Sequence, residues 1–331
     1  MDADDIDTGE PGFFETGSDE KGFDMDRVTR WVRGFAVALA LAAPGAGAQD
    51  GRGDVVYVPT PQIVVDEMLQ MAKVGPKDYV IDLGSGDGRI VVTAAKQFGA
   101  RGFGVDLDTH LNKLANERAS KEGVADRARF IEQNLFETDL GSATVITSYL
   151  LPEMNLKLRP KLLSLKPGTR VVAHDYAMGD WDPDDERILI VPEKTVGDPG
   201  KSYVYLWVVP ARVAGRWESQ LPVGGRTVAY QFAFEQRYQV VQGSVRIDQR
   251  EFRLPQIRLN GEEMNFPLNA TIGGSLVSHR FRGWVKDDVI EGTVTIGEGA
   301  GQRVTPWRAK LTARGEARMS AVAPALAGAF R

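Results

Sequence analysis

Residues 79–89 read YVIDLGSGDGR, and this segment contains the strongest indication of the fold. An apolar, strand-like run ends in Asp82, and glycines at the alternate positions Gly84, Gly86 and Gly88 precede a helix-like segment. Glycine lets the backbone turn sharply and approach a ligand without interference from a Cβ atom. The helix that follows offers free N–H groups at its N-terminus. The pattern therefore predicts a ligand-binding loop at the edge of an α/β sheet.

The spacing of the glycines narrows the choice of ligand. A dinucleotide fingerprint needs G-x-G-x-x-G, but the third glycine counted from Gly84 would fall on Arg89. The acids Asp82 and Asp87 would repel a pyrophosphate and suit a ligand with an ammonium group and hydroxyls. Asp106 ends the next strand-like run, where a carboxylate can accept hydrogen bonds from both ribose hydroxyls. The two elements together predict S-adenosylmethionine as the cofactor; the alternative is a glycine-rich turn without a ligand.

Residues 54–210 alternate strand-like and helix-like segments, which predicts right-handed βαβ units and a mostly parallel sheet. The expected strands cover 79–83, 102–107, 128–133, 144–149 and 169–174. The expected helices cover 61–73, 88–98, 109–122 and 155–165. Two further strands, 187–191 and 203–209, are expected to close the sheet edge as an antiparallel hairpin. The predicted fold class is α/β, a Rossmann-like seven-strand sheet with helices on both faces.

The helical pattern is lost from about residue 212, and turn signals separate short β-rich segments. The expected strands cover 227–235, 238–247, 252–259, 277–285, 289–296 and 303–312. Residues 212–316 are therefore predicted to form an antiparallel barrel or sandwich. Its aromatic residues are expected in the core rather than against a ligand: Phe232, Phe234, Tyr238, Phe281 and Trp284. Residues 317–331 are expected to be a flexible tail.

Two segments precede the α/β region. Residues 1–24 are acidic and glycine-rich and are expected to be disordered. Residues 25–48 hold three arginines, a short apolar run and Ala-Gly-Ala, which is the order of a secretory signal. This segment predicts export to the periplasm or envelope, with Met25 as a possible true start and an interfacial or buried helix as the alternative. A cytoplasmic location stays open, because S-adenosylmethionine is made in the cytosol.

Composition excludes several classes of function. A net charge of −5 gives no basic face for nucleic acid. The chain has no cysteine, which excludes thiol nucleophiles, disulfides and cysteine-ligated zinc. Only three histidines, His110, His174 and His279, are present, and this argues against a histidine-rich metal site. No metal is expected.

Several motifs resemble those of a known family. DLGSGDGR followed by GVDLD resembles the first two motifs of class I, seven-strand methyltransferases. YVPTPQIVVDEML and YLLPEMNLKLRPKLLSLKPGTRVVAHDYAMGDW resemble a narrower group, the bacterial relatives of mitochondrial protein-lysine N-methyltransferases. Those enzymes act on the ATP synthase c-subunit and the adenine nucleotide translocase, and the similarity covers about residues 55–209. It implies methyl transfer to a protein lysine, with membrane proteins as possible substrates.

The resemblance also implies which residues bind the cofactor. The implied residues are Thr60, Gln62, Asp82, Gly84, Ser85, Gly86, Gly88, Asp106 and Asn134. Thr60 and Gln62 would belong to a lid, the loop residues would hold the methionine end, and Asp106 would hold the ribose. Asn134 departs from the family pattern, which usually has Asp against the adenine amino group, although its carbonyl can still accept that bond.

Three residues after the fourth expected strand are candidates for catalysis: Tyr149, Glu153 and Asn155. A lysine acceptor must lose a proton from a group with a pKa of about 10.4, and a dry channel would lower that pKa. Asn155 could align the amine and Glu153 could take the proton. Alternatively, Tyr149 is an ordinary aromatic, Asn155 caps a helix, and Glu153 is a solvated first-turn acid. His174 and Asp175 suit either a general base or a strand end.

Two other functions remain open. The chain could methylate a small molecule or a lipid, or it could be an exported, non-catalytic binding protein that keeps a vestigial cofactor fold. The sequence predicts neither the oligomeric state nor the role of the β-rich domain.

Overall fold

The computed structural model describes residues 57–319. The predicted acidic extension 1–24 and the signal-like segment 25–48 lie outside the described residues, as does 320–331. Within the described part, no helix is long and apolar enough to cross a membrane. The same part contains no group of three or more His, Asp or Glu side chains that could hold a metal ion.

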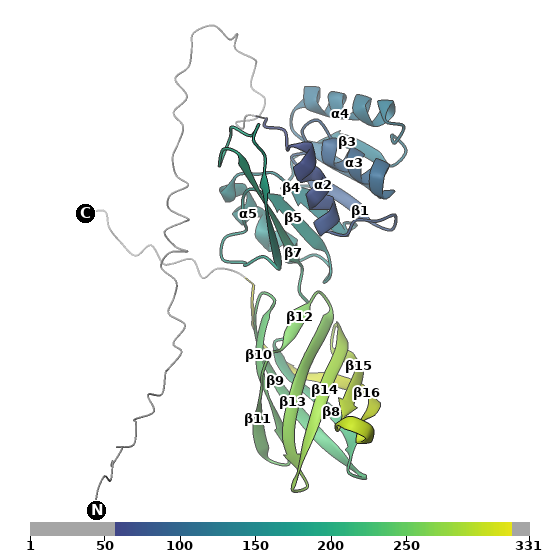
Figure 1. Cartoon of the computed structure of the whole chain (residues 1–331), viewed down its shortest axis with the longest axis vertical. Coiled ribbons are helices and arrows are strands. Elements are labelled where there is room, and N and C mark those ends of the chain that lie inside the picture. Colours follow the sequence, from purple (N-terminus) through teal and green to yellow (C-terminus); the bar gives the residue numbers. More distant parts are fainter. Residues whose placement is uncertain (1–56, 320–331) are drawn as a thin grey trace, which may run out of the picture. The chain divides into compact units, whose positions relative to one another are not determined.

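A seven-strand sheet with the strand order β3-β2-β1-β4-β5-β7-β6 forms the first domain (Figure 1). Its strands are β1 (Tyr79–Leu83), β2 (Arg101–Asp106), β3 (Ala128–Glu132), β4 (Val145–Ser148), β5 (Arg170–His174), β6 (Asp185–Ile190) and β7 (Lys201–Val208). Its helices are α2 (Gln62–Met71), α3 (Arg89–Phe98), α4 (Thr109–Lys121) and α5 (Pro152–Leu162). Strands β1 to β5 run parallel, and β6 and β7 form the antiparallel hairpin. The predicted α/β fold is confirmed.

Both faces of this sheet are covered, so its central strands are apolar on both sides. Successive residues of a strand point to opposite faces. On one face Val80 of β1 packs in a cluster with Val65 and Met68 of α2. On the other face Ile81 packs in a cluster with Leu158 of α5. This two-sided burial explains why the run before the glycine loop is almost continuously apolar.

The strand order also indicates where a ligand would bind. Strand β1 pairs with β2 on one side and with β4 on the other, so the chain reverses its direction of winding there. Ligands of open α/β sheets bind at the carboxyl ends of the strands beside such a reversal. The glycine loop follows β1 directly at that edge.

Helix α5 begins three residues earlier than predicted. Leu151 is its N-cap, and Pro152 occupies the first helical position, where a missing N–H is harmless. The backbone N–H of Asn155 donates to the carbonyl of Leu151, at 3.1 Å, so Asn155 lies within the first turn. The interpretation of Asn155 as the helix cap is therefore wrong.

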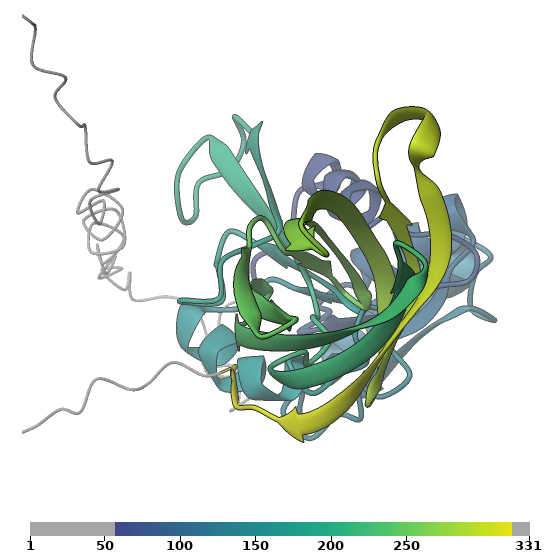
Figure 2. The same ribbon diagram turned by 90° about the horizontal axis from the view of Figure 1, so that it is seen from below.

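The C-terminal domain is one antiparallel sheet that curls on itself (Figure 2). Its strands, in the order β11-β10-β9-β8-β16-β15-β14-β13-β12, are β8 (Gly215–Val223), β9 (Arg226–Arg237), β10 (Val240–Ile247), β11 (Arg250–Leu254), β12 (Arg258–Asn260), β13 (Glu263–Ile272), β14 (Ser275–Lys286), β15 (Val289–Ile296) and β16 (Arg303–Arg314). The predicted antiparallel domain is confirmed. A short strand β17 (Ala317–Arg318) pairs with β9, so the flexible-tail prediction is wrong for these two residues.

The aromatic residues of this domain divide into three groups. Phe232, Phe234 and Phe281 are buried in its core, as predicted. Trp284 is 40% exposed, with the guanidinium of a neighbouring arginine over its ring, so the core prediction is wrong for it. Tyr238 is buried, but it packs in a cluster of the first domain.

Candidate active site

The glycine loop bends in a conformation that suits glycine. Gly84, Gly86 and Gly88 have φ angles of +75°, +52° and +76°, a region that side chains disfavour. The N–H groups of Gly84 and Ser85 both donate to the carbonyl of Val105, at 2.9 and 3.0 Å. These bonds fasten the loop to the end of β2, beside Asp106.

Asp106 points toward the loop, as the ribose-binding prediction requires. Its Oδ2 accepts from the N–H of Gly86 at 2.9 Å, and its Oδ1 accepts from the N–H of Asp108 at 3.0 Å. Asp108 has a separate task, because its carboxylate accepts from two N–H groups at the start of α4 and caps that helix. The two neighbouring acids therefore serve different parts of the structure.

Gly88 packs tightly against buried side chains of β3 and α4. A Cβ at this position would lie 2.5 Å from Phe130 Cζ and 2.7 Å from Ala115 Cβ. Gly88→Ala is expected to lower the free energy of unfolding by about 2–5 kcal/mol, combining left-handed strain with overpacking. Gly99→Ala is the control, since its φ is +71° but its nearest neighbour, Pro76, lies 3.4 Å away. Urea unfolding should separate the two, and equal losses would contradict the packing given to Gly88.

Asp82 is buried at the end of β1, where Thr147 Oγ1 donates to its Oδ1 at 2.7 Å. Burial raises the pKa of Asp82 to about 7, against the hydrogen bond from Thr147, and the charges of Asp106 and Asp87 add to the rise. A carboxyl group with a pKa near 7 loses its proton readily when a cationic ligand binds beside it.

Cofactor affinity is therefore expected to rise with pH, by up to roughly tenfold from about pH 6 to about pH 8. The carboxyl of Asp82, with its pKa of about 7, ionises across this range, and the ionised form favours the ammonium group of S-adenosylmethionine. Asp82→Asn should flatten the dependence when binding is measured by calorimetry at several pH values. The same slope in both proteins would show that another group is titrating.

Asp87 differs from the prediction that it faces the ligand. Its Oδ2 accepts from both Arg89 and Arg118 at 2.7 Å. Burial by itself would raise the pKa of Asp87, but the hydrogen bonds and positive charge of these arginines outweigh it and lower the pKa. Asp87 is thus neutralised within the protein and ties the loop to α3 and α4.

An aromatic and acidic wall lies at the carboxyl ends of β4 and β5 and contains Tyr149, His174, Asp175 and Tyr176. We call it the acceptor wall, because the methyl acceptor is expected beside Tyr149. The hydroxyl of Tyr149 donates to Asp175 Oδ2 at 3.0 Å, and its ring packs on His174 with centroids 4.0 Å apart. Tyr149 also stacks with Tyr176, with ring centroids 6.2 Å apart. Burial, together with the charge of Asp175, raises the pKa of Tyr149 far above its usual range, so the hydroxyl keeps its proton.

Asp175 is held by a lysine that the sequence analysis did not single out. Lys194 Nζ lies 2.7 Å from Asp175 Oδ2, and both side chains are only 5% exposed. Asp175 also has φ +62°, while the N–H of Tyr176 donates to the carbonyl of His174 across it at 2.8 Å. Such backbone strain persists where surrounding contacts hold it, often at functional sites.

His174 is a neutral positioning residue in this arrangement. Its Nδ1 lies 3.2 Å from Thr60 Oγ1, and its Nε2 lies 3.0 Å from Ser202 Oγ. Burial lowers the pKa of His174 to about 4; nearby Asp175 opposes that shift and Lys194 adds to it. With both ring nitrogens engaged by hydroxyls, His174 is poorly placed to act as a general base.

The remaining predicted residues divide by location. Asn155 is fully buried, and its Nδ2 donates to the carbonyl of Tyr176 at 3.0 Å, so it joins the wall. Glu153 is exposed in the first turn of α5. Gln62 donates to Asp66 and Thr93, between α2 and α3, so its lid role stays a prediction.

Asn134, after β3, uses its side chain locally. Its Oδ1 accepts from the N–H of Phe136 at 3.0 Å, and its Nδ2 donates to Glu137 at 3.3 Å. A carbonyl oxygen has two lone pairs, so one acceptor site remains for an adenine amino group. The adenine role of Asn134 stays a prediction.

Tyr57 also belongs to this edge, although it was not predicted. A Cβ on Gly86 would lie 2.3 Å from its ring, so the ring lies directly against the loop. Tyr57 begins the segment YVPTPQIVVDEML, which carries part of the family resemblance, and only Val58 separates it from the Pro-Thr-Pro motif. This position is the signal that could have found it.

The residues present fit S-adenosylmethionine. Three buried polar atoms at this edge have no partner in the described chain: Ser85 Oγ, Ser148 Oγ and Asn155 Oδ1. Leaving such atoms unpaired costs about 1–3 kcal/mol each, so they are available to a bound molecule. Asp106, the buried acid Asp82 and the side-chain-free loop add the groups that a ribose and an ammonium require.

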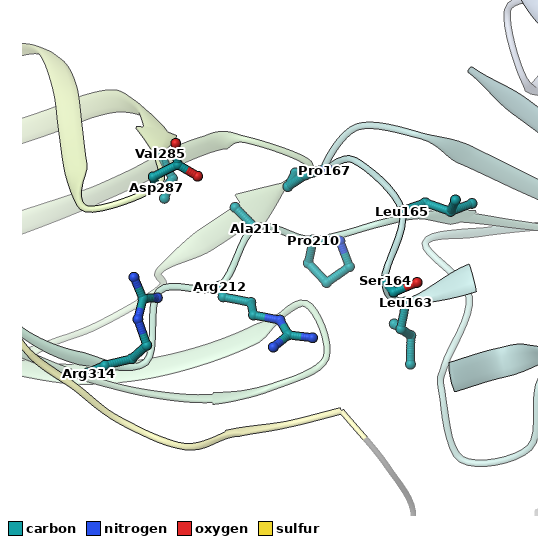
Figure 3. A pocket seen from close by; sticks show the side chains of 10 residues that line it. All are labelled: Leu163, Ser164, Leu165, Pro167, Pro210, Ala211, Arg212, Val285, Asp287 and Arg314. Carbon is teal, nitrogen blue, oxygen red and sulfur yellow. The ribbon is translucent and has the colours of Figure 1, made fainter. Parts of the chain in front are cut away.

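A separate pocket of about 270 Å³ lies away from this edge (Figure 3). Leu163 and Pro167 line it from the segment that precedes β5, and Arg212, Asp287 and Arg314 line it from further along the chain. The segment before β5 is at the opposite end of that strand from His174. This pocket is therefore no part of the candidate cofactor site.

Strand order, glycine loop and Asp106 together define a class I, seven-strand S-adenosylmethionine-dependent methyltransferase. The model of the ANTKMT methyltransferase domain matches residues 82–185. A protein-lysine N-methyltransferase of Saccharolobus islandicus is 47% identical over 157 residues, which cover 47% of this chain and 94% of that protein. A lysine N-methyltransferase of the ATP synthase c-subunit from Xenopus laevis is 32% identical over 155 residues, covering 46% and 68%. This chain belongs to the methyltransferase family that contains these two enzymes.

One solved structure is also similar in sequence. It is an RNA methyltransferase from Salinibacter ruber in complex with S-adenosyl-L-homocysteine, 48% identical, with a TM-score of 0.42. The match covers 47% of this chain and 96% of that one.

Proposed function

We propose that this enzyme methylates the side-chain amine of a protein lysine. The observation that carries the proposal is the 47% identity to a protein-lysine N-methyltransferase, over nearly the whole length of that relative. The similarity to an enzyme that methylates the ATP synthase c-subunit supports the same acceptor chemistry and adds a membrane protein as one candidate substrate.

Exposed apolar side chains of the edge strand β6 and of helix α5 are the contacts that we propose for a protein acceptor. Ile188 and Ile190 of the edge strand β6 are 57% and 66% exposed, and Leu156 of α5 is 43% exposed. Ile188 lies opposite Tyr203 on β7, and the N–H of Tyr203 donates to Asp175. The apolar strand edge is thereby connected to the acid of the acceptor wall.

In methyl transfer from a sulfonium, the protein has to position the acceptor amine more than it has to activate the methyl group. When bound, the cofactor supplies a methyl group already activated on a sulfonium. The protein must orient the amine and keep water out, since a dry channel favours the neutral lysine. Tyr149 and Tyr176 provide the apolar walls of such a channel. The unpaired Asn155 Oδ1 suits an N–H donor of the amine.

Labelled S-adenosylmethionine added to an RNase-treated lysate should place label on protein lysines. Tyr149→Phe is expected to slow transfer by roughly 10–100-fold, because it removes a hydrogen bond to a charged group that is worth about 1.5–3 kcal/mol. Tyr79→Phe, at the other end of the sheet, is the matched control. Label found only in small molecules would support the small-molecule or lipid alternative and overturn the lysine proposal.

A further inference from the structure

The turn between β9 and β10, residues 237–239, reaches from the β domain to the first domain. Gln239 binds there with both ends of its amide. Its Oε1 accepts from Trp181 Nε1 at 3.0 Å, and its Nε2 donates to the carbonyl of Asp182 at 2.7 Å. Trp181 is fully buried, and its own carbonyl accepts from Trp207 of β7 at 2.8 Å. One side chain of the β domain thus fixes the segment that follows β5.

Tyr238 reinforces this contact by packing. It has φ +51° and is 3% exposed, and its ring stacks on Trp181 with centroids 6.1 Å apart. The guanidinium of Arg159, on α5, lies 5.9 Å from the centre of the same ring. The tyrosine therefore forms part of the first domain's core although it comes from the second.

A shared carboxylate makes the third link. Asp180 accepts from Arg159 at 2.7 Å and from Arg237 of the turn at 3.0 Å. Arg159 is 8% exposed and also donates to the carbonyl of Met178 at 2.6 Å. Helix α5 and the β9–β10 turn hold residues 176–184 between them.

The same segment begins at the acceptor wall. Tyr176 stacks on Tyr149, and its carbonyl accepts from Asn155 Nδ2. Asn155 and Arg159 are four residues apart on α5 and so lie on one face of the helix. One face of α5 therefore contacts residues 176–184 at two points. Asn155 binds Tyr176 at the acceptor wall, and Arg159 binds Asp180, which also binds the β9–β10 turn.

We infer that the β9–β10 turn is a positioning element for the methyl acceptor, with Gln239 as its main residue. It acts by fixing residues 176–184, and through them Tyr176 and Asn155 at the acceptor wall. The Saccharolobus relative is matched over 94% of its length by 157 residues, so little of it is left to form a similar β domain. The contacts of the β9–β10 turn are therefore a support that this relative has little chain length to supply. The kinetic part of the inference depends on the proposed lysine acceptor, and the structural part does not.

Hydrogen exchange of the full chain tests the structural part without any acceptor. Gln239→Ala is expected to speed exchange in residues 176–184 by at least roughly tenfold while residues 84–88 stay unchanged. Gln242→Ala, an exposed glutamine on the neighbouring strand β10, is the control and should change neither segment. An unchanged rate in 176–184, or an equal rise in both segments, would overturn the inference.

Kinetics with RNase-treated lysate protein as the acceptor test the functional part. Gln239→Ala should lower kcat/KM for the lysate protein by roughly tenfold or more, with the Kd for S-adenosylmethionine within about twofold of the parent. A purely structural role would weaken cofactor binding as well, and that result would overturn the positioning role. If the parent protein transfers no label to lysine, the proposed function fails, and the exchange measurement still decides whether the turn holds the segment.

Discussion

Replacing Lys194 with methionine is expected to lower the free energy of unfolding by about 3–5 kcal/mol. The change leaves the buried carboxylate of Asp175 without its cation, and breaking one half of a buried ion pair is strongly destabilising. The lysine nitrogen lies 2.7 Å from that carboxylate, and it also donates to the carbonyl of Lys201. Catalysis should fall too, because the acid that accepts from the Tyr149 hydroxyl would lose its buried cation and keep only the N–H of Tyr203 as a backbone donor.

A double substitution makes this prediction specific. Asp175→Asn combined with Lys194→Met removes both charges, and asparagine tolerates the positive φ of the position better than most residues. The double variant should therefore be more stable than Lys194→Met alone, as urea unfolding can measure. Lys113→Met, at a side chain 76% exposed, should stay within about 0.5 kcal/mol of the parent. Additive losses in the double variant would contradict the ion pair.

Asp106→Ala should weaken S-adenosylmethionine binding by roughly 100-fold or more. The carboxylate aligns the loop through the N–H of Gly86, and it is the group expected to accept both ribose hydroxyls. Hydrogen bonds to charged groups contribute about 1.5–3 kcal/mol each, so losing two of them gives an effect of this size.

Calorimetric titration of Asp106→Ala and Asp108→Ala would test that expectation. Asp108→Ala removes a helix cap and should cost about 1 kcal/mol of stability while leaving the cofactor affinity nearly unchanged. Weak binding by both variants, or an affinity within about threefold of the parent for Asp106→Ala, would contradict the ribose role.

Much of the α/β fold could be predicted because local patterns and topology agree. The strand before the glycine loop is apolar on both faces, and its predicted bounds match β1. The strands of the β domain were harder to predict, and β13 was not among the expected strands. Strand β13 buries Met264, Phe266 and Leu268 in strict alternation, but it contains Pro267, which argues against a strand. The structure resolves this conflict, because β12 pairs only with residues 263–265 and β13 needs no N–H on that side at Pro267.

The sequence likewise predicted some residues of the site and missed others. Asp106 could be found because parallel strands end at one edge, so an acid closing β2 must lie beside the loop after β1. Lys194 could not, because it comes from the β6–β7 connection and reaches Asp175 only when that hairpin folds back. Tyr238 and Gln239 lie in another domain, and no local pattern indicates that they contact Trp181.

Mass spectrometry of lysine methylation in cells with and without the gene is the most direct test of the cofactor site and of the proposed lysine acceptor. We predict that at least one lysine loses its methyl groups on deletion and regains them with the parent gene, but not with the Asp106→Ala variant. If no lysine differs between the strains, or if the Asp106→Ala variant restores methylation fully, then the cofactor site or the acceptor described above is wrong.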